Sequence, residues 1–333
     1  MASIERIGVI GAGAWGTALA QTARLAGRDV VLWAREAEVA DEINSSRRNS
    51  IFLPGVVLEP GLTATNDLAE IAECQAILLV PPAQHVRTVG AALAPLLVPN
   101  TPVVICAKGL EQATGKLMGD VLGEVLPQAR RAVLSGPSFA ADVARGLPAA
   151  LSLASEDSEL GRELAEAIGY RNFRLYWSAD VTAVQFGGAL KNVLAIAAGI
   201  VDGKDLGASA HAALVTRGFA EMRRLGLKLG ARPETLAGLS GLGDLILTCG
   251  SPQSRNMSLG RALGQGQKLA DVLGGRRSVS EGVFTAAAVV KLAGEQGVEM
   301  PIASAVDAIV TGALDVDTAI DALLSRPFRD EHS

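Results

Sequence analysis

The sequence predicts an α/β domain with a mostly parallel, doubly wound sheet, followed by an all-α domain. β-rich runs alternate with helical patterns in the first half of the chain, and after residue 177 only helical patterns remain. Alternating strands and helices imply a parallel sheet covered on both faces. We therefore expect a first domain over residues 1–179 and a second over residues 180–333.

The strands expected in the first domain are short β-rich runs. They span residues 7–10, 30–33, 76–80, 103–106, 132–134, 151–154 and 173–177. Helical patterns lie between several of them, for example at residues 15–26 and 84–97. The last two strands complete this domain, because no convincing strand follows them.

The second domain is expected to begin with a long helix, capped by Ser178 or Asp180 and continuing to about residue 199. Further helices are predicted at residues 208–229, 255–264, 280–296, 302–311 and 316–324. The Gly- and Ser-rich stretch 239–258 is long for a structureless loop. Such loops are usually functional or mobile, so we expect one of these roles here.

Composition limits the class of protein. The chain has 333 residues, 49% hydrophobic and 20% charged, which suits two domains that each bury a core. A net charge of −5 without a basic run argues against nucleic-acid binding. No signal segment opens the chain, and no apolar run reaches the ~18 residues of a membrane helix, so we expect a cytoplasmic protein without membrane insertion. Three cysteines without C-x-x-C spacing, and scattered histidines, predict free thiols and no metal site.

The first motif is IGVIGAGAWGTALA, in which G-x-G-x-x-G follows a strand and opens a helix. Gly11 permits a tight turn, Gly13 lets the backbone approach a pyrophosphate, and Gly16 lets the helix pack closely on the strand. Ala14 and Trp15 lie between them, where the anion meets the free helix amides. The motif predicts a dinucleotide-binding domain of the Rossmann type. The alternative is a glycine-rich turn in another α/β protein.

The end of the second strand bears on cofactor choice. NAD-specific folds place an acid there to bind the ribose 2′-hydroxyl. Here the strand ends Leu-Trp-Ala, and Arg35 follows. Arginine suits a 2′-phosphate, so NADP(H) is expected to be accepted beside or in preference to NAD(H). A solvated surface arginine is the alternative.

Lys191 lies within the apolar helical segment FGGALKNVLAIAAG, beside Asn192. A lysine in such a helix either extends its amine to the edge of the apolar surface or is a functional amine in a desolvated site. Desolvation lowers the pKa of a lysine towards the range useful for proton transfer. Lys191 is therefore a candidate proton-transfer group, with Asn192 as a neighbouring donor and acceptor.

A second candidate segment is GLGDLILTC, with Asp244 and Thr248, followed by SPQSRN. Asp244 could equally be a turn residue or a helix cap. Ser254 can cap a helix whose first turn carries Arg255 and Asn256. A cation beside free helix amides suits a phosphate, whereas a surface arginine is the alternative.

Two first-domain strands end in candidate binding residues. The strand VVICAKG ends in Lys108, and LSGPSFA places Gly136, Ser138 and Ala140 after another strand. Ligands bind outside the carboxyl ends of strands in such sheets. Neither segment matches a hydrolase nucleophile elbow or a phosphate-binding P-loop.

Taken together, these segments resemble the NAD(P)-dependent glycerol-3-phosphate dehydrogenases of the bacterial type. The matching segments are GAGAWGTALA, AKG, SGPSFA, GGALKNVLAIAAGIVDG, RGFAE, GLGDLILTC, SRN and VSEG. Each alone is weakly specific, but all eight occur in family order across about residues 7 to 300.

The resemblance implies reduction of dihydroxyacetone phosphate to sn-glycerol 3-phosphate with NADH or NADPH, in the supply of glycerophospholipids. It places Lys191 at the catalytic acid/base position, with Asp244 expected to orient Lys191 or a substrate hydroxyl. Substrate positions fall on Lys108, Gly136, Ser138, Lys191, Asn192, Asp244, Thr248, Ser254, Arg255 and Asn256. Cofactor positions fall on Gly11, Gly13, Ala14, Trp15, Gly16, Arg35, Lys108, Ala140, Arg255, Val279 and Glu281.

The sequence departs from the family at Ala14, where serine is common, and near Ser209, where asparagine is common. Two other functions remain open. A 3-hydroxyacid dehydrogenase would need a carboxylate clamp, and a noncatalytic dinucleotide-binding sensor would not need an amine in an apolar helix. A homodimer is expected because soluble oligomers are most often two-fold.

Overall fold

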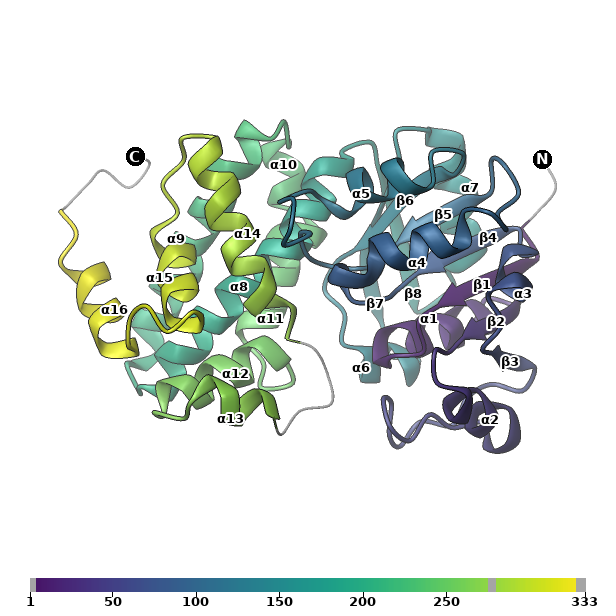
Figure 1. Ribbon diagram of the computed structural model, residues 1–333, viewed down its shortest axis with the longest axis horizontal. Helices are drawn as coiled ribbons and strands as arrows, with labels where there is room; N and C mark the ends of the chain where they lie inside the picture. The colour runs from purple at the N-terminus through teal and green to yellow at the C-terminus, as the bar shows by residue number, and fades with distance from the viewer. Residues whose placement is uncertain (1–3, 275–279, 328–333) are drawn as a thin grey trace. The chain divides into compact units, whose positions relative to one another are not determined.

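The computed structural model describes residues 4–274 and 280–327, which form two compact units (Figure 1). Unit 1 holds the residues up to Lys108 together with Leu117–Gln185. Unit 2 holds Gly109–Lys116 together with the residues from Phe186 onward. The division thus lies a few residues beyond position 179, inside a long helix, and one short segment of the first half groups with the second unit.

Unit 1 contains an eight-stranded sheet of order β3-β2-β1-β4-β5-β6-β7-β8. The strands are β1 (Arg6–Ile10), β2 (Asp29–Trp33), β3 (Leu62–Thr65), β4 (Ala76–Leu79), β5 (Pro102–Ile105), β6 (Arg130–Ser135), β7 (Ala149–Ala154) and β8 (Phe173–Ser178). Every neighbouring pair is parallel except β6 and β7. The predicted mostly parallel sheet is therefore confirmed.

Helices cover both faces of this sheet. One face carries α1 (Ala14–Leu25), α2 (Ala37–Ser46), α6 (Ala140–Ala144) and α7 (Ser158–Ile168), and the other carries α3 (Leu68–Ala72), η1 (Ala83–His85), α4 (Val86–Leu93) and α5 (Met118–Val125). Side chains alternate between the two cores, as in β4, where Leu78 faces the first and Leu79 the second. The doubly wound arrangement follows from strands that are apolar on both faces.

β3 and several short helices were not predicted from the sequence. β3 has the sequence LTAT, which carries one large apolar residue and no strand-like apolar run. Its hydrogen bonds come from β2 on one side and from the Asn44 side chain of α2 on the other. The helix predicted at residues 84–97 is also shorter, because α4 ends at Leu93 before the turn residues that precede Thr101.

From Phe186 onward, helices are the regular secondary structure of the described residues of unit 2. Its helices are α8 (Val181–Gly203, which begins in unit 1), α9 (Gly207–Lys228), α10 (Pro233–Leu236), η2 (Leu239–Gly243), α11 (Asp244–Cys249), α12 (Arg255–Gly264), α13 (Leu269–Gly274), α14 (Glu281–Glu295), α15 (Pro301–Val310) and α16 (Val316–Leu324). The Asp180 carboxylate accepts from the Ala183 amide at 3.0 Å, so the predicted cap of α8 is confirmed. α8 alone among the described helices is long and apolar enough to cross a membrane, but 94% of that window is buried inside the protein.

The expectation of a structureless loop at residues 239–258 is wrong. The segment forms a π-helical turn, η2, then α11 and the start of α12. Gly241 allows this, because a Cβ there would lie 2.0 Å from the Leu236 carbonyl oxygen. The glycines that resemble a loop in the sequence serve close backbone contact instead.

A buried carboxylate joins α9 to α15. Glu221 is 2% exposed, and its two oxygens accept the amides of Ile302 at 2.7 Å and Ala303 at 3.2 Å. Burial raises the pKa of Glu221 to about 7, and these hydrogen bonds oppose that rise. Glu221 thereby satisfies amides at the start of α15 that have no partner within their own helix.

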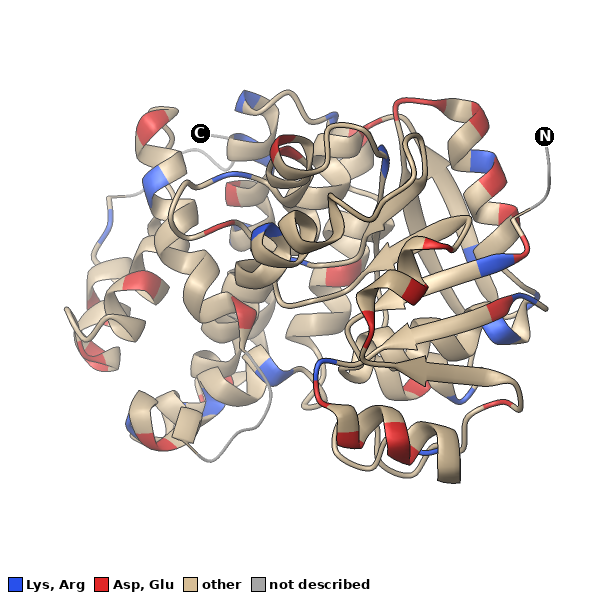
Figure 2. Ribbon diagram, turned by 45° about the vertical axis from the view of Figure 1, so that its right-hand side comes forward, with Lys and Arg blue, Asp and Glu red and all other residues tan. Residues whose placement is uncertain are grey.

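Charged residues of both signs are interspersed along the ribbon (Figure 2). This distribution accompanies the net charge of −5.

Candidate functional site

The turn from β1 into α1 has the geometry of a dinucleotide-binding loop. Gly11 has φ of +113°, and its amide donates to the Trp33 carbonyl oxygen at 3.0 Å. A Cβ on Gly16 would lie 1.8 Å from the Gly11 oxygen, so only glycine fits there. A Cβ on Gly13 would meet open space, at the N-terminus of α1. The amides of the first helical turn therefore face a space into which a pyrophosphate fits.

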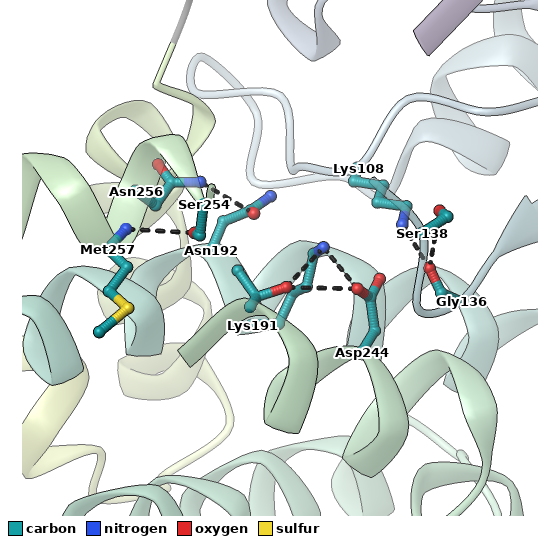
Figure 3. Close-up of polar contacts among 10 residues, drawn as sticks. Lys108, Gly136, Ser138, Lys191, Asn192, Asp244, Ser254, Asn256 and Met257 are labelled. Carbon is teal, nitrogen blue, oxygen red and sulfur yellow. Dashed lines mark hydrogen bonds and ion pairs between the residues drawn. The ribbon is translucent and has the colours of Figure 1, made fainter. Parts of the chain in front are cut away.

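Trp15 and Lys108 lie next to this turn. The Lys108 ammonium is 6.0 Å from the centre of the Trp15 ring and donates to the Gly136 carbonyl oxygen at 2.8 Å. The Ser138 hydroxyl donates to the same oxygen at 3.1 Å (Figure 3). Lys108 follows β5 and Gly136 follows β6, and β4, β5 and β6 are successive parallel strands of the sheet. The structure thus brings these predicted residues to the edge of the sheet where ligands bind.

Trp15 also supports the fit of a nucleotide. Its Nε1 atom is buried and makes no hydrogen bond within the described part of the chain. A buried donor of this kind costs free energy unless a partner is supplied. Ala140, another predicted cofactor residue, begins α6.

Arg35 follows β2 by two residues, as predicted. Its side chain is 75% exposed and forms an ion pair with Glu36, with 2.9 Å between Arg35 Nε and the carboxylate. An exposed guanidinium at the end of the second strand is accessible to a 2′-phosphate. Both earlier interpretations of Arg35 remain compatible with this position.

The centre of unit 2 is a buried ion pair between α8 and α11. The Lys191 ammonium donates to Asp244 Oδ1 at 2.7 Å and to the Thr248 hydroxyl oxygen at 3.0 Å (Figure 3). Lys191 is 7% exposed and Asp244 is fully buried. The alternative in which Lys191 extends to the helix edge is therefore wrong. Asp244 is not the N-cap of α11 either, because Gly243 occupies that position.

This arrangement fixes both the charge and the direction of the lysine. Two of the three donors of an ammonium are directed at Asp244 and Thr248. The Thr248 hydroxyl is also 3.3 Å from Asp244 Oδ1, which closes a triangle of polar atoms. Removing either charge of a buried ion pair would leave the other unpaired, at a cost of several kcal/mol. The site can therefore deliver a proton to an oxygen atom.

Close backbone contact between helices places the next group of residues. Gly199 and Gly203 of α8 face Met257 and Arg261 of α12, where added Cβ atoms would lie 2.0 and 2.3 Å from carbonyl oxygens. Gly260 of α12 lies equally close to α8, since a Cβ there would be 2.0 Å from the Ile196 carbonyl oxygen. Residues four apart lie on one face of a helix, so these glycines form a continuous contact. The four-residue spacing of Gly199 and Gly203 is visible in the sequence, although no helix contact was predicted from it.

The contact brings Asn192 and Asn256 together. Asn256 Nδ2 donates to Asn192 Oδ1 at 2.9 Å, and Asn256 Oδ1 accepts the Gly282 amide at 3.1 Å. Ser254 caps α12 by accepting the Met257 amide at 3.2 Å, as predicted (Figure 3). Arg255 is the exposed first residue of that helix. A cation at a helix N-terminus beside buried amides forms a group suited to a phosphate.

Two predicted cofactor residues and the cysteines remain to be placed. Glu281 begins α14, next to the Gly282 amide that Asn256 holds. The remaining predicted cofactor residue, Val279, lies outside the described residues. Cys249 is buried at the end of α11, and burial raises its pKa to about 12, while the charge of Lys191 opposes the rise. Cys74 and Cys106 are also free and buried, as expected.

Comparison with known proteins identifies one family along the chain. Residues 6–161 and 180–321 match the N-terminus and the C-terminus of NAD-dependent glycerol-3-phosphate dehydrogenase. The chain is 62% identical over 327 residues to glycerol-3-phosphate dehydrogenase (NAD(P)+) of Parvibaculum lavamentivorans, covering 98% of each chain. It is 59% identical to that of Caulobacter vibrioides, covering 99% of each. The crystal structure of glycerol-3-phosphate dehydrogenase from Coxiella burnetii superimposes with a TM-score of 0.93 at 39% identity, covering 97% of this chain and 99% of that one.

Proposed function

The chain belongs to the NAD(P)-dependent glycerol-3-phosphate dehydrogenase family, and from this premise we propose a role for each site residue. It is an oxidoreductase that reduces dihydroxyacetone phosphate to sn-glycerol 3-phosphate with a nicotinamide cofactor. The single observation that carries the chemistry is the buried Lys191–Asp244 ion pair. It supplies a proton donor of the kind that ketone reduction requires.

The cofactor is assigned mainly to unit 1. The amides between Gly11 and Gly16 would hold the pyrophosphate, and Arg35 would bind the 2′-phosphate of NADP(H). The other proposed cofactor residues are Ala14, Trp15, Lys108, Ala140, Arg255, Val279 and Glu281. When bound, the nicotinamide supplies a hydride to the ketone carbon. We propose that NADPH is accepted and NADH is not excluded, because no acid follows β2 where a 2′-hydroxyl would be bound.

Lys191 is the proposed catalytic acid. As the ketone carbon receives hydride, negative charge develops on the carbonyl oxygen, and the Lys191 ammonium donates a proton to it to form the product hydroxyl. In the reverse direction the neutral amine accepts that proton. Asp244 and Thr248 hold the amine in position, since both accept hydrogen bonds from it. A positioned acid stabilises the developing charge without reorganisation during the reaction.

The substrate phosphate is assigned to the start of α12. Arg255 supplies charge, Ser254 and Asn256 supply polar atoms, and the helix amides complete the anion site. Asn192 is held by Asn256, so its amide group has a fixed orientation towards ligand atoms. Lys108, Gly136 and Ser138 are proposed as further substrate contacts from unit 1.

The cellular context follows from the product. We propose that the enzyme works in the cytoplasm, without membrane insertion or nucleic-acid binding, and supplies sn-glycerol 3-phosphate for glycerophospholipid synthesis. A homodimer is proposed as its assembly.

One assay tests the proposed function against its alternatives. NADPH and NADH oxidation is followed with dihydroxyacetone phosphate and, in parallel, with a panel of 3-oxoacids. We expect turnover with dihydroxyacetone phosphate alone. Turnover only with 3-oxoacids would identify a 3-hydroxyacid dehydrogenase, and binding of NADPH without turnover on any substrate would identify a sensor.

A further inference from the structure

The two edge strands of the sheet in unit 1, β3 and β8, differ in how their outward backbone groups are hydrogen-bonded. At the β3 edge, Asn44 donates to the Ala64 carbonyl oxygen and accepts the Ala64 amide, both at 2.8 Å. The Leu62 amide donates to the Glu59 carbonyl oxygen at 3.3 Å. A side-chain amide thus takes the place of another strand. This edge is closed to further pairing.

The β8 edge is open. The carbonyl oxygens of Asn172 and Ser178 accept amides of β7, so the backbone groups of even-numbered residues face β7. Those of Phe173, Leu175 and Trp177 therefore face away from the sheet. Phe173 is bonded to Tyr170, whereas within the described residues no backbone hydrogen bond is formed by the outward groups of Leu175 and Trp177.

Large side chains accompany these open backbone groups. Tyr176 is 58% exposed and Trp177 is 36% exposed. Beside them lies a groove of about 440 Å³, lined by Tyr170, Arg171, Arg174 and Tyr176 among others. An exposed strand edge with aromatic residues is a template for pairing with another chain.

We propose that β8 pairs antiparallel with β8 of a second copy of this chain, about a two-fold axis that passes through Tyr176. This inference gives an interface to the homodimer proposed above and does not depend on the catalytic assignment. In this register Leu175 lies opposite the partner's Trp177, and the reverse pair follows by symmetry. Both residues present outward backbone groups, so the two copies exchange four hydrogen bonds and the two sheets become one.

The side chains fit this register. On one face of the sheet Leu175 lies opposite Trp177, whose indole packs over Gly161 and donates to the Ser155 carbonyl oxygen of its own chain at 3.1 Å. On the other face Tyr176 meets the partner's Tyr176. Apolar and aromatic pairs of this kind stabilise neighbouring strands. Arg174 lies opposite the partner's Ser178, so no like charges face each other. The two Arg174 positions are about 14 Å apart along the strands, which exceeds the screening length at physiological salt.

The test uses the residue on the two-fold axis. Tyr176→Glu and Tyr176→Lys each place two like charges face to face in the dimer. In a monomer the side chain is exposed, so neither substitution should destabilise the fold. We expect the dimer Kd of each variant, measured by sedimentation equilibrium, to be at least about 100-fold higher than that of the wild type. Mixing the two variants should restore the dimer, because glutamate then faces lysine. Val98→Glu, at a residue 61% exposed elsewhere in unit 1, is the matched control and should leave association unchanged.

A covalent test checks the register. Tyr176→Cys should form an intermolecular disulfide on mild oxidation, because directly opposed residues of this pair type have Cα atoms about 4.5 Å apart. The three native cysteines are buried, so the crosslink reports the new thiol. A monomeric wild type, a Tyr176→Glu dimer of wild-type strength, or a mixture that stays monomeric would each overturn the proposal. The same preparations are assayed with dihydroxyacetone phosphate, and only an inactive wild type would contradict the dehydrogenase function.

Discussion

The nucleotide-binding turn of unit 1 and the Lys191 centre of unit 2 are built in different ways. The turn uses backbone amides and glycines from one contiguous segment between β1 and α1. The Lys191 centre uses side chains that are 53 and 57 residues apart in the sequence. Local sequence determines the first, whereas helix packing determines the second. Substitutions in the two regions should therefore fail in different ways.

The largest expected effect separates chemistry from nucleotide binding. Lys191→Met removes the proton donor, so kcat should fall about 10²–10⁴-fold with dihydroxyacetone phosphate as substrate. The Kd for NADPH, measured by fluorescence titration, should stay unchanged because the binding turn lies in unit 1. Lys204→Met is the control, since Lys204 pairs with Asp317 near the surface. Near-native turnover of Lys191→Met would show that the centre is structural.

Helix packing is tested next. Gly199→Ala places a Cβ 2.0 Å from the Met257 carbonyl oxygen, so α8 and α12 must separate. We expect a loss of about 1–3 kcal/mol in the free energy of unfolding in urea, together with weaker substrate binding. Gly294→Ala in α14 is the matched control. A Cβ there meets nothing within 4 Å, so it should stabilise the protein by up to about 1 kcal/mol. Equal behaviour of the two variants would refute the role of backbone contact.

Glu221 gives a smaller, pH-dependent effect in a part of unit 2 away from the proposed chemistry. Its folded pKa of about 7 exceeds the ordinary 4.5, so the folded protein binds this proton more tightly than the unfolded chain. The contribution of Glu221 to stability is therefore greatest at low pH and declines as pH rises from 4.5 to about 7. The decline should be on the order of 3 kcal/mol.

Urea unfolding of the wild type and Glu221→Gln across this pH range measures the decline. The difference between the two proteins should change with pH, because glutamine has no proton to release. A difference that is constant with pH would mean that folding leaves the pKa of Glu221 unchanged.

The smallest effect concerns the cofactor. Arg35→Ala should raise the KM for NADPH relative to NADH by about tenfold, the loss of one charge-assisted contact. kcat should change little, since Arg35 is remote in sequence from the proton donor. Arg48→Ala, at another exposed arginine of unit 1, should leave the ratio unchanged. An unaltered ratio of the KM values for NADPH and NADH in Arg35→Ala would show that Arg35 is a solvated surface residue without a role in cofactor choice.

Features determined by local sequence could be predicted, whereas features determined by packing between distant segments could not. Strong apolar periodicity predicted α12 and α16 with their observed bounds. The polar strand β3 carried no such signal, and its outer edge depends on Asn44, which is distant in sequence. Lys191 stood out because it interrupts an apolar helix. The family resemblance implied that Asp244 orients Lys191 or a substrate hydroxyl, and the ion pair agrees with the first. Apolar periodicity alone could not show this pairing, since it depends on how α11 packs.

The short segment Gly109–Lys116 has a consequence for biosynthesis. It is encoded between β5 and α5, yet it belongs to unit 2, and its Leu110 is fully buried in the complete chain. A nascent polypeptide therefore lacks the rest of this unit until residues beyond Phe186 leave the ribosome, and a truncation after Gln185 would lack it permanently. The nucleotide-binding half is thus best produced with the whole chain, even though its sheet is complete within the first half.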